Sequence, residues 1–204
     1  MEGKRPLRRD RMGNASVDMD GALWGLFRGR IRGGKKRQLM ITRASKILLL
    51  VSVALLYTLV VFNNLTDFDS NYQFVRHVLS MDSTFPGNRG MWRALTSPAM
   101  HLAFYLSIIA WEMITTILLW WGVVDLLRAL RRPAAQFTSA KRIPVLGLTV
   151  SLLMWLVAFL SIGAEWFLMW QSHAWNGQEA AFRNFAVVGL VLIFLVQPDA
   201  DSQP

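Results

Sequence analysis

One carboxylic acid, Glu112, lies near the middle of an apolar stretch that covers residues 98–127. A charge at the centre of a bilayer costs about 3 kcal/mol or more, so such a residue needs a partner or a function. A protonated glutamic acid that is hydrogen-bonded to another helix would have a structural role. A proton relay or a ligand site would use the same group chemically. Glu112 is therefore the candidate intramembrane acid, with both roles open.

A second group of polar residues is expected at one depth, near the outer leaflet. Its members lie where apolar stretches begin or end, so the helices would bring them to the same height. An ion pair between Glu165 and Arg183 would join two of these helices. Such a cluster could hold the helices together or line an outward-facing pocket. The residues of this candidate cluster are Asn63, Asn64, His101, Glu165, Gln171 and Arg183.

The sequence offers few groups for cofactor chemistry. It has three histidines and no cysteine, which excludes disulfides, iron–sulfur clusters and thiol catalysis. No close metal-ligand spacing and no nucleotide-binding, serine-hydrolase or zinc-protease motif is present. We therefore expect no cofactor, no metal and no catalytic residue. A haem- or quinone-binding subunit that uses His101, Glu165 and His173 is an alternative.

Four apolar stretches must position these residues. Uncharged runs of about 20 residues are long enough to cross a hydrocarbon core of about 30 Å as helices. Ser97 followed by Pro98 is a typical helix start. The expected spans cover residues 47–66, 98–127, 143–170 and 178–197. The fold class is therefore all-α, an up-down four-helix transmembrane bundle.

The basic residues indicate one orientation of these spans. Residues 1–46 contain 13 Lys/Arg, and the three segments that follow the first, second and third spans contain 3, 5 and 1. This alternation matches the rule that basic loops stay in the cytoplasm. We therefore expect an inner-membrane, multi-pass protein with both termini in the cytoplasm.

A short helix is expected outside the spans, over residues 71–81. Tyr72, Val75, Val78 and Leu79 recur at helical spacing, and Ser70 with Gln73 fits a capping box. Such an amphipathic helix would lie on the outer membrane surface.

The chain divides into three parts by composition. Residues 1–42 form a basic tail, expected to be disordered and drawn to anionic lipid rather than to nucleic acid. Natural translation from Met40 is an alternative account of this tail. Residues 43–197 form the membrane domain, and residues 198–204 form a short C-terminal tail.

Two stretches carry a family resemblance. They are NNLTDFDSNYQFVRHVLSMD at residues 63–82 and EWFLMWQSHAWNGQEAAFR at residues 165–183. Over residues 43–197 the chain resembles a bacterial family of predicted small integral membrane proteins with four spans, and the MWQS and WNGQ segments are the distinctive part. The resemblance supports the topology and implies no catalytic residue or cofactor.

These observations favour a non-enzymatic role. The expected function is that of an accessory or assembly subunit, held in the lipid bilayer and packed against a larger membrane complex. The alternatives are the haem- or quinone-binding oxidoreductase subunit and a small proton-coupled transporter centred on Glu112.

Overall fold

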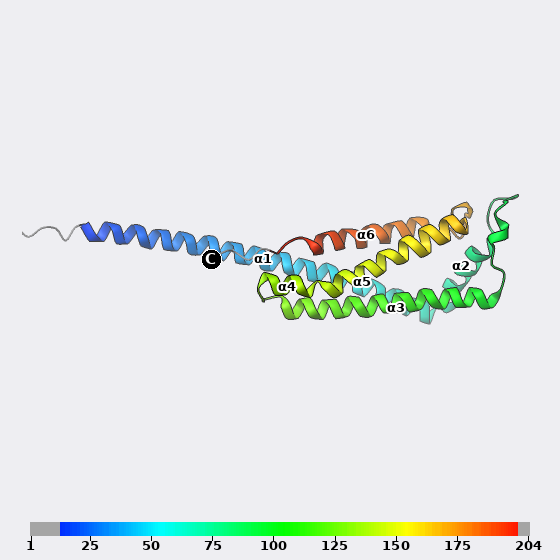
Figure 1. Ribbon diagram of the computed structural model, residues 1–204, viewed down its shortest axis with the longest axis horizontal. Helices are drawn as coiled ribbons and strands as arrows, with labels where there is room; N and C mark the ends of the chain where they lie inside the picture. The colour runs from blue at the N-terminus through cyan, green and yellow to red at the C-terminus, as the bar shows by residue number, and fades with distance from the viewer. Residues whose placement is uncertain (1–12, 200–204) are drawn as a thin grey trace, which may run out of the picture.

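The computed structural model describes the backbone of residues 13–199 and the side chains of Trp24 and residues 33–199. All regular structure within that part of the chain is helical, and four long segments are apolar enough to cross a membrane. These segments are α1 (Gly13–Thr66), α3 (Pro98–Ala129), the joined helices α4 (Ala134–Ala140), α5 (Arg142–Leu153) and η2 (Met154–Trp166), and α6 (Gln178–Val196). The prediction of a four-helix transmembrane bundle is confirmed (Figure 1).

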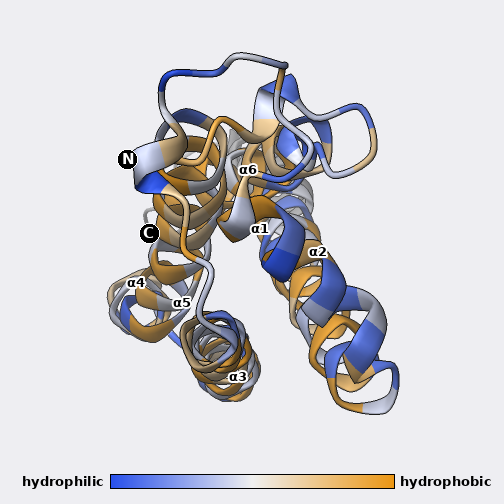
Figure 2. Ribbon diagram, turned by 90° about the vertical axis from the view of Figure 1, so that its right-hand side faces the viewer, coloured by the Kyte–Doolittle hydropathy of each residue, from blue (hydrophilic) through white to orange (hydrophobic). Residues whose placement is uncertain are grey.

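The outward surface of the bundle is apolar. In the most apolar window of each span, only 22% to 33% of the residues are buried within the chain. Large side chains such as Leu48, Ile117 and Leu190 point away from the core. Figure 2 shows hydrophobic residues all around the long helices and hydrophilic residues mainly in the connections. Such a continuous apolar surface is compatible with lipid as the solvent and not with water.

Helix α3 lies between α1 and α5 and makes a close contact with α5. A Cβ atom at Gly122 would lie 2.7 Å from Cγ of Pro144 and 2.9 Å from its backbone nitrogen. A Cβ atom at Gly147 would lie 3.2 Å from the side chain of Leu119. The two glycines therefore allow the backbones of α3 and α5 to approach closely, as small residues do in other membrane helices.

Helices α3 and η2 separate toward the opposite end of the bundle, and helix α2 (Phe68–Ser80) lies there (Figure 1). Helix α2 buries Val75, Val78 and Leu79 in a cluster that also contains Tyr105 and Phe167. The expected amphipathic helix is therefore confirmed, and its apolar face packs into the bundle.

The predicted capping box at the start of this helix is wrong. Helix α2 begins at Phe68, before Ser70, so Ser70 cannot be the N-cap. Its hydroxyl donates to the carboxylate of Asp67 at 2.9 Å, and the Gln73 amide donates to Asp69 at 3.1 Å. Acidic side chains at the helix start thus take the bonds that the capping box would have used.

The third span is not a regular α-helix throughout. Helix η2 is a π-helix, in which backbone bonds close over five residues instead of four. The hydroxyl of Ser161 accordingly donates to the carbonyl of Leu156 at 2.9 Å. The helix ends at Trp166, four residues before the expected end, because Leu168 adopts a left-handed conformation with φ of 54°. Two short helices, η1 (Met91–Arg93) and η3 (Met169–Gln171), lie in the connections at this end.

The basic tail differs from the expected disordered segment over part of its length. Helix α1 continues back to Gly13 without a break, and the side chains of residues 33–38 are exposed. Residues 1–12 lie outside the described part of the chain.

Candidate functional site

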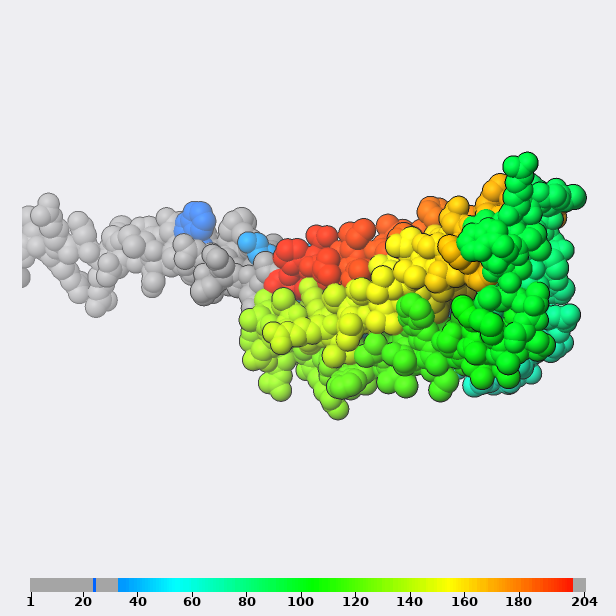
Figure 3. All heavy atoms as spheres, turned by 45° about the vertical axis from the view of Figure 1, so that its right-hand side comes forward, coloured from blue at the N-terminus to red at the C-terminus, as the bar shows by residue number. Residues whose placement is uncertain are grey.

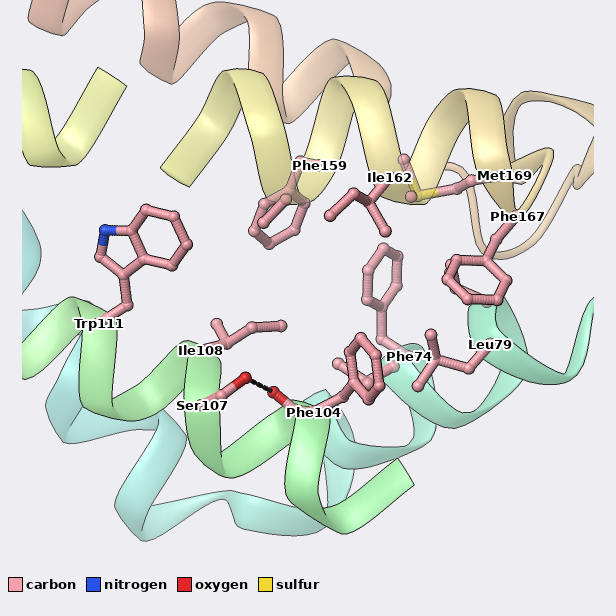
Figure 4. A pocket seen from close by; sticks show the side chains of 14 residues that line it. Phe74, Leu79, Phe104, Ser107, Ile108, Trp111, Phe159, Ile162, Phe167 and Met169 are labelled. Carbon is pink, nitrogen blue, oxygen red and sulfur yellow. Dashed lines mark hydrogen bonds between the residues drawn. The ribbon is translucent and has the colours of Figure 1, made fainter. Parts of the chain in front are cut away.

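Two adjoining cavities lie where α3 and η2 separate. The first, named here the apolar cavity, has a volume of about 160 Å³ and is lined by side chains of α2, α3 and η2. Figure 4 shows Phe74, Phe104 and Phe159 among the rings that surround it. The second, named here the polar cavity, has a volume of about 320 Å³. The cavities share four wall residues, Phe74, Val75, Ile108 and Phe159.

Glu112 lines the polar cavity and takes part in a buried hydrogen-bond network. Its Oε2 atom accepts a hydrogen bond of 2.5 Å from the side-chain amide of Asn64 on α1. The hydroxyl of Tyr105, which lies two turns earlier on the same face of α3, donates to the Asn64 backbone carbonyl at 3.2 Å. Glu112, Asn64 and Tyr105 are all nearly inaccessible to solvent. The network joins α1 to α3, which supports the structural role that the sequence allowed for Glu112.

Only one oxygen of Glu112 is satisfied in this way. Within the described part of the chain, Oε1 has no hydrogen-bond partner, and Asn63 and Asn71 line the same cavity. Since a carboxyl group can accept at both oxygens, the site retains an acceptor that a bound molecule could use.

A second buried network joins α1 to the third span. The hydroxyl of Tyr57 lies 2.6 Å from the hydroxyl of Ser151 and accepts a 2.8 Å bond from the indole of Trp155. The indole of Trp111 donates to the carbonyl of Val150 at 3.1 Å. Tyr57 and Ser151 were not predicted from the sequence, because an isolated hydroxyl in an apolar run carries no spacing signal. These bonds fix the positions of two aromatic rings beside the cavities.

The six residues of the predicted polar cluster have separate contacts. Asn64 contacts Glu112, whereas Asn63 lines the polar cavity with an exposed side chain. His101 is buried, and its Nε2 donates to the carbonyl of Leu95 at 2.7 Å.

The other three members of the predicted cluster lie in or beside the loops. The amide oxygen of Gln171 accepts bonds from the Phe85 backbone and the Asn88 side chain. Glu165 and Arg183 are both exposed, and no ion pair joins them within residues 33–199. The expected Glu165–Arg183 pair is therefore absent there, because each side chain faces outward from its own helix.

The two stretches that carry the family resemblance pack against each other over the cavities. The ring of His77 stacks on Trp175 with centroids 4.5 Å apart. Directly after the first stretch, the hydroxyl of Ser83 donates to Ser172 at 2.8 Å. A Cβ atom at Gly177 would lie 2.9 Å from the ring of Phe74. The segments 63–82 and 165–183 thus form one cap at this end of the bundle.

The opposite end holds an ion cluster that the sequence analysis missed. Asp199 is buried, and its carboxylate contacts the ammonium groups of Lys46, at 3.0 Å, and of Lys141. The guanidinium of Arg43 lies 4.0 Å from the same carboxylate. These four residues, named here the Asp199 cluster, hold the segment that follows α6 against α1 and against the α4–α5 junction.

A basic cleft lies beside the Asp199 cluster. Its volume is about 470 Å³, and its basic lining residues are Lys36, Arg43, Arg131 and Arg132. The Arg43 guanidinium donates to the carbonyl of Arg132 at 2.7 Å, which holds the α3–α4 connection against α1.

The part of the chain that the structure describes contains no group of three or more side chains able to hold a metal ion. His173 is exposed and lies in the loop after the third span. His101, by contrast, is buried in α3.

The comparisons with known proteins agree with this architecture. No curated protein and no solved structure matches the chain. A family described as predicted small integral membrane protein (DUF2165) matches residues 42–198, which include most of the first span, the other three spans and the residues that line both cavities. This chain therefore belongs to the family of predicted small integral membrane proteins.

Proposed function

We propose that this protein is a non-enzymatic accessory or assembly subunit of a larger membrane complex. The observation that carries the proposal is the exposed face of α6. This helix is the shortest span, and only 22% of its most apolar window is buried within the chain. Figure 3 shows α6 along the outside of the bundle.

The face of α6 has features that favour a protein neighbour. Phe182, Leu190 and Ile193 each expose more than half of their surface. Arg183 is exposed near the start of the same helix. Lipid can cover the apolar side chains, but a cation beside a large aromatic side chain is a common feature of protein interfaces.

Site-specific photo-crosslinking in living cells would test this role. A crosslinking amino acid at position 190 or 193 should form an adduct with the same second protein in every replicate. The yield of this adduct should be near-stoichiometric. The same amino acid at Leu48 or Leu59, on the exposed face of α1, is the matched control. The accessory role would be refuted if the yield of protein adducts at the α6 positions did not exceed the yield at the α1 positions.

We further propose that the protein lies in the bacterial inner membrane with both termini in the cytoplasm. The basic residues Arg43, Lys46 and Lys141 gather at the end of the bundle where Asp199 lies, and Arg131 and Arg132 line the adjacent cleft. This asymmetry supports a cytoplasmic location for that end. A reporter enzyme that is active only in the cytoplasm should be active when it is fused after residue 204. The same reporter should also be active when it is fused at the N-terminus.

The basic cleft also supports anionic lipid as a partner of the N-terminal segment. Each basic residue near an anionic surface contributes roughly 1 kcal/mol of attraction. Replacement of Arg131 and Arg132 by Gln should reduce the retention of anionic lipid during purification. Arg128→Gln, at the exposed end of α3, is the control, since Arg128 does not line the cleft.

A further inference from the structure

The wall of the polar cavity combines aromatic rings with a single acid. Phe74, Tyr105, Trp155 and Phe159 line it together with Glu112. Aromatic faces attract cations through the ring quadrupole, and aromatic cages are a recurrent means of recognising quaternary ammonium groups. An adjacent carboxyl group adds charge complementarity, which such a cage alone does not have.

The charge balance at this cavity favours a cationic ligand. None of the residues that line the cavity is a lysine, arginine or histidine. The one polar contact of the Glu112 side chain within the described part of the chain is the neutral amide of Asn64. A bound cation would supply the counter-charge that the protein itself does not place there.

The rings of the cavity are held before any ligand arrives. Tyr105 is fixed by its bond to Asn64, and Trp155 is fixed by its bond to Tyr57. A rigid wall reduces the ordering cost that binding would otherwise carry. The cavity is therefore built as a site and is not a gap left by poor packing.

The apolar cavity provides space for the rest of such a molecule. It extends between Trp111 and Phe167, and Phe74 and Phe159 lie between these two residues, as Figure 4 shows. Both cavities together fall within the range of small-molecule sites, roughly 300–1,000 Å³. An acceptor among aromatic rings in the polar cavity and apolar walls in the apolar cavity suit a molecule with a cationic head and an apolar body.

We propose that the two cavities bind a lipophilic organic cation, with its charged group at Glu112 and its apolar part in the apolar cavity. The proposal does not depend on the accessory role, because it concerns the interior of the bundle and not the face of α6. An anion would be repelled by Glu112, and a neutral molecule would leave Oε1 without a charged partner.

Equilibrium dialysis of the full chain in a mild detergent would test the proposal with two probes of the same shape. Phenyltrimethylammonium carries one positive charge, and tert-butylbenzene has a carbon atom in place of the nitrogen. Protein-free micelles correct for partition into detergent. The wild-type protein should bind the cation about tenfold more tightly than the neutral probe. Equal affinity for the two probes would overturn the proposal.

Substitutions locate the site. Glu112→Gln should reduce the preference for the cation to the smaller part that the aromatic rings supply, and it should leave the affinity for the neutral probe unchanged. Phe159→Leu, which removes one ring but keeps an apolar side chain, should lower cation affinity several-fold. Ala180→Phe, which fills the polar cavity, should abolish binding of both probes.

Asp125→Asn is the matched control for Glu112→Gln. Asp125 lies on the same helix, 4.0 Å from Arg128, and does not line either cavity. This variant should keep the wild-type preference, and its loss would contradict the assignment to Glu112. If Glu112→Gln does not fold, the comparison of the two probes on the wild-type protein and the Phe159→Leu variant still test the proposal. Full cation affinity in Phe159→Leu would contradict the role of the aromatic rings.

Discussion

The two ends of the bundle bury their polar groups in different ways. At one end, the carboxylate of Asp199 is surrounded by Arg43, Lys46 and Lys141, and α3 and α5 are in close contact. At the other end, α3 and η2 separate, and Glu112 faces a cavity with one amide as its partner. A charge with several opposite charges around it supports packing, whereas an acid with spare acceptor capacity leaves room for a ligand.

The largest effect is expected when the Asp199 cluster is broken. Asp199→Asn leaves three cations close together without the carboxylate that balances them. Removal of one member of a buried charged group costs about 3–5 kcal/mol of unfolding free energy. Denaturant titration of the purified protein in detergent would measure the loss. Asp125→Asn is the control, because the partner of Asp125 is an exposed arginine. Equal losses in both variants would show that the Asp199 cluster is no more important than a surface pair.

A smaller effect is expected at the close contact between α3 and α5. Gly122→Ala places a Cβ atom 2.9 Å from the backbone nitrogen of Pro144, which cannot move aside like a flexible side chain. Overpacking of this kind costs about 1–3 kcal/mol. The same measurement on Gly189→Ala is the control, since its Cβ atom would have its nearest neighbour at 3.9 Å. If Gly189→Ala is the more damaging variant, the close contact is not a determinant of the fold.

The hydrogen-bond network between α1 and the third span should contribute less to the free energy of unfolding than the contact between α3 and α5. Tyr57→Phe removes the hydroxyl that accepts the Trp155 bond and pairs with Ser151. Because polar pairs between membrane helices average about 0.6 kcal/mol, two of them should cost about 1–2 kcal/mol. Thermal unfolding followed by tryptophan fluorescence would detect this, with Tyr72→Phe as the control outside the network. No shift in Tyr57→Phe would show that these bonds are replaced in the variant.

The smallest effect on stability is expected at Glu112. Glu112→Gln keeps an acceptor for Asn64 and a similar shape, so the loss should be less than the roughly 0.6 kcal/mol of a whole polar pair. Thermal unfolding of this variant beside Asp199→Asn compares the two ends of the bundle directly. A loss at Glu112 that equals the loss at Asp199 would mean that both acids are structural and that the two ends do not differ.

Much of the fold follows from residue patterns. The four apolar runs, the start of α3 at Ser97-Pro98 and the apolar face of α2 were all predictable from length and spacing. The π-helix was not, because its residues are as apolar as those of an α-helix and no capping or breaking residue marks the change.

The partners of the polar residues were harder to predict. Asn64 was predicted to lie in one cluster with Glu165 and Arg183, because all three were expected at the same depth in the membrane. Its actual partner is Glu112. Helix α3 has 32 residues, more than a bilayer needs, so its first turns rise past the end of α1 and bring Glu112 level with Asn64. Asp199 was missed because acids in a tail contribute little to the rule that sets orientation.

The π-helix η2 makes this span more sensitive to the insertion or deletion of a residue than to substitution by another apolar residue. Loss of one residue within it would let the remaining backbone return to four-residue bonding without breaking the helix. Because a π-helix turns less per residue than an α-helix, both the lost residue and the return to α-helical winding would rotate the side chains beyond the deletion relative to those before it. Gly163 and Ala164 would leave their places beside Met169 and the cap. Length variation within residues 154–166 would therefore reshape the cavities while the hydrophobic profile of the span stayed the same.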